Sequence, residues 1–144
     1  MARIEINLPE DFLYTVELPV RVTDLNYGNH VGNDSILGLI HEARLQFYRS
    51  LGFKNELSFE GSIGQVISDA AIVYKAEAFY GDVLICKIAA ADFNKYGFDL
   101  FYVLTSKNSG NEVARGKTGI VCFDYDKRKV ASAPSILVEK LRLK

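Results

Sequence analysis

The residues best suited to chemistry lie in one short stretch, TDLNYGNHVGND, which covers residues 23–34. This stretch holds two Asp, three Asn, two Gly and one of the two His residues of the chain. Carboxylates and imidazoles can accept protons, whereas an Asn amide can only hold a water molecule by hydrogen bonding. The stretch is therefore either a well-capped turn or an active site for general acid–base chemistry.

His30 and Asp34 are the candidate proton acceptors within this stretch. The alternative for His30 is a structural role, in which the imidazole hydrogen-bonds the backbone of the turn. The alternative for Asp34 is a helix N-cap, a role that contributes about 1 kcal/mol. Asp69 is a further candidate, because it lies in the apolar run VISDAAIVY. Facing inward, Asp69 would have a pKa raised by desolvation, as a base requires; facing outward, it would be an ordinary surface acid.

The element that must position this stretch is a helix predicted over residues 34–53, DSILGLIHEARLQFYRSLGF. Its apolar residues recur every three or four positions and form one stripe: Ile36, Ile40, Ala43, Phe47 and Leu51. Residues 33–35 are the candidate N-caps, and Gly52 supplies the stop. Gly38 lies inside the helix, where glycine costs up to about 1 kcal/mol against Ala. A close approach to a strand, a partner or a ligand would explain it.

The remaining pattern is mostly that of strands. A roughly alternating run covers residues 12–22, and four longer runs follow the helix: residues 63–79, 82–93, 97–107 and 112–125. The breaks YGD, NKYG and NSGN have turn chemistry, so the four runs are expected to be antiparallel neighbours. A short final helix is predicted over residues 134–143. This order predicts an α+β fold in which a curved antiparallel sheet wraps a long central helix.

Composition limits the classes of partner. The 144 residues contain no repeat or linker, so a single domain over residues 1–144 is expected. A formal net charge of −1 gives no electrostatic signature of nucleic acid or an anionic membrane, and no run is long enough to span a membrane. Cys86 and Cys122 lie in apolar runs and are expected to be buried, reduced thiols. Charges and a proline interrupt the first twelve residues, unlike a signal peptide, so a cytoplasmic location is expected.

Residues 21–44, RVTDLNYGNHVGNDSILGLIHEAR, resemble the signature of hotdog-fold thioesterases of the 4-hydroxybenzoyl-CoA thioesterase-like group. In words, that signature reads Asp, any residue, Asp, a few residues, Gly-His-Val-Asn-Asn, and then a helix containing Glu-Ala-Arg. The segment VYKAEAFYGDVL, residues 73–84, resembles the group's Tyr, small loop and Gly-Asp before an apolar strand. With the matching order of elements, the likeness extends from about residue 21 to residue 125 and implies a hotdog fold.

The resemblance also implies an assembly and a substrate. Two subunits of such proteins usually join their sheets edge to edge, and acyl-thioester sites lie at the subunit interface beside the helix N-terminus. A homodimer or homotetramer is therefore expected, acting on an acyl-CoA or acyl-carrier-protein thioester without a cofactor or metal.

Thioester hydrolysis needs donors for the developing oxyanion and a group that activates water. The backbone N–H groups of Gly32, Asn33 and Asp34 are the expected donors, because a helix N-terminus offers free N–H groups and a positive dipole end. Asn26 falls where many members of the group have the catalytic carboxylate. An amide is no general base, so Asn26 is predicted to position water. His30, Asp34 and Asp69 stay open as the base.

Four further residues are expected to bind substrate: Asp24, Tyr27, Glu42 and Lys75. Asp24 matches the first Asp of the signature, and Tyr27 lies in the same loop. Glu42 matches the helix Glu of the group; its alternative is a pair with a nearby Arg or Lys. Lys75 is suited to a carrier phosphate, and its alternative is protection of a strand edge.

The sequence therefore predicts an acyl-thioester hydrolase in which water attacks the thioester carbonyl. The alternative is a non-catalytic acyl-thioester binding or regulatory protein, and Asn26 is its main support. A hotdog hydratase or dehydratase ranks below both, because it expects a differently placed acid and His.

Overall fold

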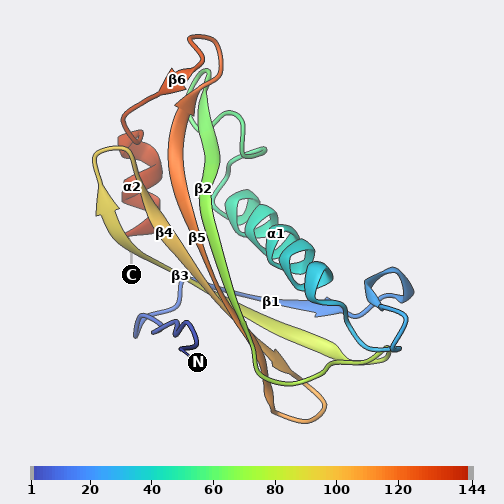
Figure 1. Cartoon of the computed structure of the whole chain (residues 1–144). Helices are drawn as coiled ribbons and strands as arrows, with labels where there is room; N and C mark the ends of the chain where they lie inside the picture. Colours follow the sequence, from blue (N-terminus) through green and yellow to red (C-terminus); the bar gives the residue numbers. More distant parts are fainter. Residues whose placement is uncertain (1, 143–144) are drawn as a thin grey trace.

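One long helix lies against one face of a strongly curved antiparallel sheet (Figure 1). The computed structural model describes residues 2–142. The elements in chain order are β1 (Tyr14–Pro19), a 3-10 turn (Val22–Asp24), α1 (Asn33–Ser50), β2 (Ile63–Tyr74), β3 (Val83–Asn94), β4 (Gly97–Ser106), β5 (Glu112–Asp124), β6 (Lys129–Val130) and α2 (Ser135–Leu141). The α+β fold predicted from the pattern, with a curved sheet around a central helix, is confirmed. The predicted last residue of the final helix, at position 143, lies outside the described residues.

The sheet has the strand order β1-β3-β4-β5-β2, and β6 pairs with the end of β5. The pairs β3–β4 and β4–β5 are the antiparallel neighbours that the sequence predicts. The expectation that β2 and β3 are neighbours is wrong, because β2 pairs with β5. Residues 75–82 form no tight hairpin: Ala78 O accepts the Val31 N–H at 2.8 Å, and Phe79 bridges His30. β2 therefore forms one edge of the sheet, and no described strand pairs with its outer side.

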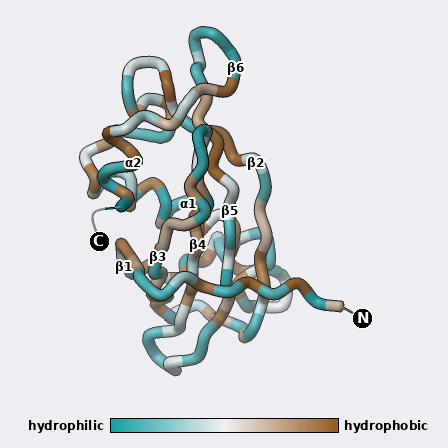
Figure 2. The backbone as a smooth tube through the Cα atoms, turned by 90° about the vertical axis from the view of Figure 1, so that its left-hand side faces the viewer, coloured by the Kyte–Doolittle hydropathy of each residue, from teal (hydrophilic) through white to brown (hydrophobic). Residues whose placement is uncertain are grey.

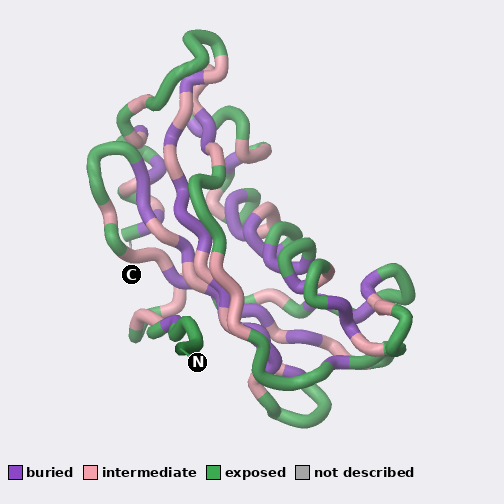
Figure 3. Tube along the Cα trace, in the orientation of Figure 1, coloured by how far each residue is buried: buried purple, intermediate pink, exposed green. Residues whose placement is uncertain are grey.

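The core lies between α1 and the sheet (Figure 3), where the apolar stripe of the helix is buried. Gly116 of β5 permits this approach, since a Cβ there would lie 2.6 Å from Ile40 Cδ1. The predicted burial of both cysteines is confirmed. Burial raises the pKa of the Cys86 thiol to about 12 and that of the Cys122 thiol to about 11.

The N-terminal segment crosses the opposite face of the sheet (Figure 2). Arg115 Nη1 donates to Ile6 O at 3.0 Å, which fixes the segment against β5. Residues of β5 alternate between the faces, so Arg115 and Lys117 lie on the far face, while Gly116 and Thr118 lie on the face toward α1.

The helix ends differ slightly from the prediction. The N-cap of α1 is Gly32, with extended backbone at φ −69° and ψ 152°, and no side chain caps the helix. The N-cap role for Asp34 is therefore wrong, because Gly32 O already accepts the N–H groups of Ser35 and Ile36. At the other end Leu51 is the C-cap, and Gly52 at φ 97° ends the helix as predicted.

Candidate functional site

The loop before α1 is held by Asp24. Its side chain is 7% exposed, accepts the backbone N–H of Arg21 at 2.8 Å, and pairs with the Arg21 guanidinium at 3.2 Å. The Asp24 carbonyl accepts the Gly32 N–H at 3.0 Å. The backbone of Asp24 thus closes the loop onto the start of the helix, while its carboxylate fixes Arg21 at the other end of the 3-10 turn.

Asn26 is also engaged within the loop. Its Oδ1 accepts the Gly28 N–H at 2.9 Å, and its backbone N–H donates to His30 O at 2.9 Å. Asn29 follows with a positive φ of 65°, a conformation that Asn adopts more readily than most residues. The polar density of the stretch is therefore partly turn chemistry. Tyr27, at the tip of this loop, is fully exposed.

The start of α1 offers one free backbone donor. The Gly32 N–H is taken by Asp24 O at 3.0 Å, so the expectation that Gly32 donates to a ligand is not supported. The Asp34 N–H donates to Asn33 Oδ1 at 2.9 Å. Among residues 2–142, no group accepts the N–H of Asn33. This N–H lies at the positive end of an 18-residue helix dipole, which favours a negatively charged oxygen.

A cleft of about 320 Å³ opens beside this donor, between the start of α1 and β2. We call it the N-terminal cleft; it is lined by His30, Val31, Asn33, Ile36, Tyr74, Lys75, Ala76, Glu77, Ala78 and Val113. His30 Nδ1 lies 3.1 Å from Val31 O, so the imidazole both contacts the turn backbone and borders the cleft. Tyr74 Oη donates to Asn33 O at 2.9 Å. Lys75 pairs with Glu112 at 3.2 Å at the rim.

A second hollow of about 460 Å³ continues along α1 toward the middle of β2. We call it the edge groove; it is lined by Asp34, Leu37, Gly38, His41, Arg44, Ile67, Ala70 and Thr118. The helix residues recur every three or four positions and therefore form one face of α1. Asp34 lies at the end of the edge groove nearest the helix start. A Cβ added at Gly32 would lie only 2.6 Å from Asp34 Oδ1, so a larger residue there would crowd this carboxylate. The two hollows share no lining residue, but Asn33 lines the N-terminal cleft and its neighbour Asp34 lines the edge groove.

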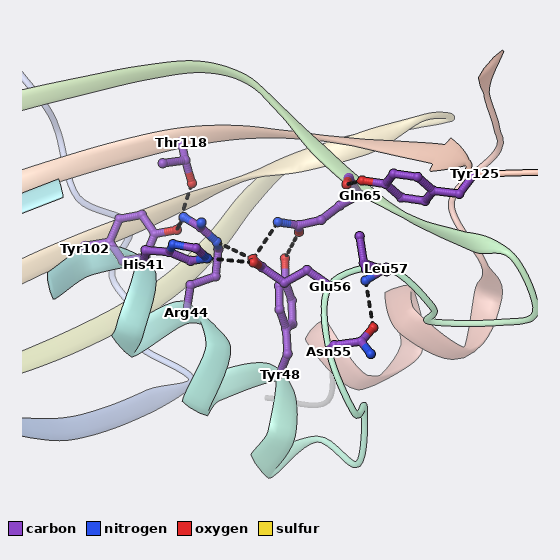
Figure 4. Close-up of polar contacts among 10 residues, drawn as sticks. All are labelled: His41, Arg44, Tyr48, Asn55, Glu56, Leu57, Gln65, Tyr102, Thr118 and Tyr125. Atoms are coloured by element: carbon purple, nitrogen blue, oxygen red, sulfur yellow. Dashed lines mark hydrogen bonds and ion pairs between the residues drawn. The ribbon is translucent and has the colours of Figure 1, made fainter. Parts of the chain in front are cut away.

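Behind the edge groove lies a polar network that the sequence analysis missed (Figure 4). Glu56 accepts Arg44 Nε at 2.6 Å and Gln65 Nε2 at 2.7 Å on one oxygen, and contacts His41 Nε2 at 2.9 Å through the other. Tyr102 continues the network to Thr118, with 2.7 Å between their hydroxyls. The available signal was polar residues inside apolar patterns: Arg44 beside the helix stripe, and Gln65 and Thr118 inside strand runs. Glu56, in a polar loop, carried no such signal.

Asp69 and Glu42 border neither hollow. Asp69 lies on the sheet face away from α1, with a 60% exposed side chain that accepts Lys117 Nζ at 2.6 Å. The hydrogen bond from Lys117 lowers the pKa of Asp69, so Asp69 fits the alternative of a surface acid. Glu42 accepts Gln46 Nε2 at 2.7 Å rather than pairing with an Arg or Lys.

Gly38 is expected to be a site of stabilising substitution. A Cβ at this position would have no heavy atom within 4 Å, so close approach to a strand does not explain the glycine. Gly38→Ala should raise the free energy of unfolding by about 1 kcal/mol, because Ala restricts the unfolded chain and favours helix. Urea denaturation measures the change. Gly116→Ala is the matched control and should destabilise, since its Cβ would lie 2.6 Å from Ile40 Cδ1. A loss of stability in Gly38→Ala would contradict the open groove.

Solved structures share this fold closely. A 1,4-dihydroxy-2-naphthoyl-CoA thioesterase from Synechocystis has a TM-score of 0.81 at 23% identity, covering 89% of this chain and 94% of its own. A gentisyl-coenzyme A thioesterase has a TM-score of 0.78 at 20% identity, covering 89% and 99%. A thioesterase from Thermus thermophilus, complexed with coenzyme A and Zn, has a TM-score of 0.79 at 20% identity, covering 94% and 96%.

At these identities the structural likeness shows the fold alone. No curated protein matches the chain by sequence. The sequence pattern of the thioesterase-like superfamily, however, matches residues 20–141, which is most of the chain and includes both hollows. The protein is therefore a member of the thioesterase-like superfamily.

Proposed function

We propose that this protein hydrolyses acyl thioesters at the start of α1. The free N–H of Asn33, at the positive end of the helix and in a residue that lines the largely apolar N-terminal cleft, is the observation that carries the proposal. A thioester carbonyl accepting this N–H gains most when negative charge develops on its oxygen, which is what acyl transfer requires. The similar structures named as CoA thioesterases favour acyl-CoA over an acyl-carrier protein.

The positions of the predicted proton acceptors support two of the three. Asp34 borders the edge groove and His30 borders the N-terminal cleft. The third, Asp69, is engaged by Lys117, and Asn26, the group predicted to position water, accepts the Gly28 N–H. Asp34 and His30 are therefore the two predicted candidates that keep support. Asn33 also contributes indirectly, because rotation of its side chain would release the Asp34 N–H as a second donor.

The expected assembly belongs to the same proposal. Within residues 2–142 the outer side of β2 has no strand partner, and Ile67 on that strand is 41% exposed. An unpaired edge of twelve residues suits sheet-to-sheet pairing, as a homodimer or as part of a homotetramer. Lys75, at the rim of the N-terminal cleft, suits a phosphate of the carrier. No helix of the described residues is long and apolar enough to cross a membrane.

The test is hydrolysis of a panel of acyl-CoA thioesters, from short through long alkyl chains plus aryl groups, followed by trapping of the released thiol. We expect turnover of at least one class well above the uncatalysed rate, because an oxyanion donor at the helix end and a nearby proton acceptor both lower the barrier to hydrolysis. Binding of acyl-CoA without release of thiol would instead support the non-catalytic alternative. Absence of both binding and release would contradict the proposal.

A further inference from the structure

The edge groove contains a buried cation whose hydrogen-bonding capacity is only partly used. Arg44 is 4% exposed, and its side chain lies between Glu56 and Tyr102 (Figure 4). A guanidinium carries five N–H groups. Nε donates to Glu56 Oε2 at 2.6 Å and Nη1 donates to the Tyr102 hydroxyl at 3.4 Å. The other N–H groups of Arg44, including both on Nη2, have no acceptor among residues 2–142.

These free N–H groups are accessible from the edge groove. No buried side-chain nitrogen or oxygen of the described residues lacks a hydrogen-bond partner. Nη2 of Arg44 has no partner, so it is not sealed off from solvent, and the edge groove is the hollow that Arg44 lines. Glu56 holds the guanidinium at Nε, which leaves the two terminal nitrogens as a planar fork of donors at the groove.

Thr118 supplies a second buried polar group at the same place. It is 2% exposed and lines the groove, and its hydroxyl lies 2.7 Å from the hydroxyl of Tyr102. The same Tyr102 hydroxyl accepts Arg44 Nη1, so Arg44 and Thr118 contact one oxygen and lie close together. When Tyr102 donates to Thr118, the Thr118 hydroxyl keeps its own proton for a ligand.

Gly38 keeps the groove open on the helix side. It lines the groove, and a Cβ there would meet no heavy atom within 4 Å. Glycine inside a helix is less favourable than alanine, so neither packing nor helix propensity explains this residue. A ligand that occupies the space of the missing side chain does explain it.

The walls of the groove suit an apolar molecule. Leu37 and Ile67 line it and are 43% and 41% exposed, and Ala70 lies beside Thr118 in the register of β2 and β5. The volume of about 460 Å³ is within the range of small-molecule sites, roughly 300–1,000 Å³. Apolar walls with a few convergent donors bind a molecule that has an apolar body and a polar head.

We propose that the edge groove binds a small monocarboxylate, with the carboxylate on the Arg44 fork and the Thr118 hydroxyl and the apolar chain along the groove. The two oxygens of a carboxylate match the terminal nitrogens of a guanidinium, and such charge-assisted hydrogen bonds are about twice as strong as neutral ones. Glu56 offsets part of the charge of Arg44 from the Nε side. His41, which also lines the groove, adds a positive charge when it is protonated.

This carboxylate site is separate from the start of α1. Arg44 follows Asp34 by ten positions, which is about 15 Å along the helix axis. The edge groove and the N-terminal cleft also have no lining residue in common. The proposal therefore concerns a second ligand and does not depend on thioester hydrolysis.

The experiment measures binding of octanoate to the full chain by isothermal titration calorimetry, with octanamide as the neutral analogue. Octanoate should bind at least about 10-fold more tightly, because only the carboxylate offers two charged acceptors to the fork. Gly38→Leu fills the groove with a good helix former, and Arg44→Lys keeps the charge but removes the fork. Each should weaken octanoate binding at least about 10-fold. Arg49→Leu, at an exposed position in the last turn of α1, is the matched control and should bind octanoate as the wild type does.

Four results would overturn the carboxylate site. The first is the absence of octanoate binding, and the second is equal affinity for octanoate and octanamide. The third is loss of octanoate binding in Asn33→Pro but not in Gly38→Leu, which would place the carboxylate in the N-terminal cleft. The fourth is unchanged octanoate affinity in Gly38→Leu together with a lower mass in sedimentation, which would make the groove a contact between copies of the chain. Urea denaturation verifies that Gly38→Leu is folded, so this variant tests the site even where Arg44→Lys unfolds.

Discussion

Asn33→Pro is expected to lower kcat by about 10²- to 10³-fold while the protein stays folded, because the substitution removes the one free backbone donor at the helix start. Loss of a single oxyanion donor has this size of effect, since the donor acts mainly on charge that develops in the transition state. Steady-state kinetics on the best acyl-CoA measures it. The loss should appear in kcat more than in KM.

Proline suits this position unusually well. Asn33 is the first residue of α1, where a missing N–H costs the helix no hydrogen bond. Proline also restricts the preceding residue to extended backbone, and Gly32 already has φ −69° and ψ 152°. The substitution therefore removes the donor and leaves the helix start intact, which thermal denaturation can verify.

Asn33→Ala is the matched control, because it removes the same side chain and keeps the N–H. In the wild type, Asn33 Oδ1 accepts the Asp34 N–H at 2.9 Å, so the substitution also frees that second donor. Because the Asn33 N–H is kept, the activity of Asn33→Ala should stay within a few-fold of the wild type. Equal activity in Asn33→Pro and Asn33→Ala would show that the Asn33 N–H does not stabilise the reaction. That result would contradict the proposal that the helix start binds the oxyanion.

The fold was predictable from the sequence wherever the pattern was local. The apolar stripe of α1 and the runs of β2 to β5 come from residue spacing, and their observed bounds differ from the predicted ones by only a few residues at most ends. Residues 75–79 are the main exception, as they were assigned to the strand that ends at Tyr74. The pairing of β2 with β5 was not predictable, because the break at residues 80–82 has ordinary turn composition. Contacts of residues 78–79 with the loop before α1 prevent a hairpin there.

The site was predictable only in part, for a related reason. The resemblance located the helix start, where Asn33 is found free, but composition gave no sign that Asp24 occupies the Gly32 N–H. Glu56 lies fifteen residues after His41, in a loop without periodicity, so nothing in the sequence joins the two. The contact forms because α1 and the following loop pack against β2, and such tertiary packing cannot be inferred from local sequence patterns.

Glu56→Leu is expected to destabilise the protein by about 3–5 kcal/mol, because it leaves the Arg44 guanidinium buried without its carboxylate. Arg44 is 4% exposed, and its Nε donates to Glu56 at 2.6 Å. Gln65 would lose an acceptor as well. Chemical denaturation with two spectroscopic probes measures the free energy of unfolding. Glu60→Leu, at an exposed carboxylate in the same loop, is the matched control and should change it by less than about 0.5 kcal/mol.

The double substitution Arg44→Met with Glu56→Leu tests the cause of this destabilisation. The cause is either the loss of the ion pair or the burial of an unpaired Arg44 charge. Replacing a whole buried pair by apolar residues of similar size is often neutral, since neither charge then stays desolvated. The double variant should therefore recover most of the stability that Glu56→Leu loses. Equal destabilisation of the single and double variants would mean that the hydrogen bonds of Gln65 and His41 to Glu56, rather than the buried charge of Arg44, hold this region together.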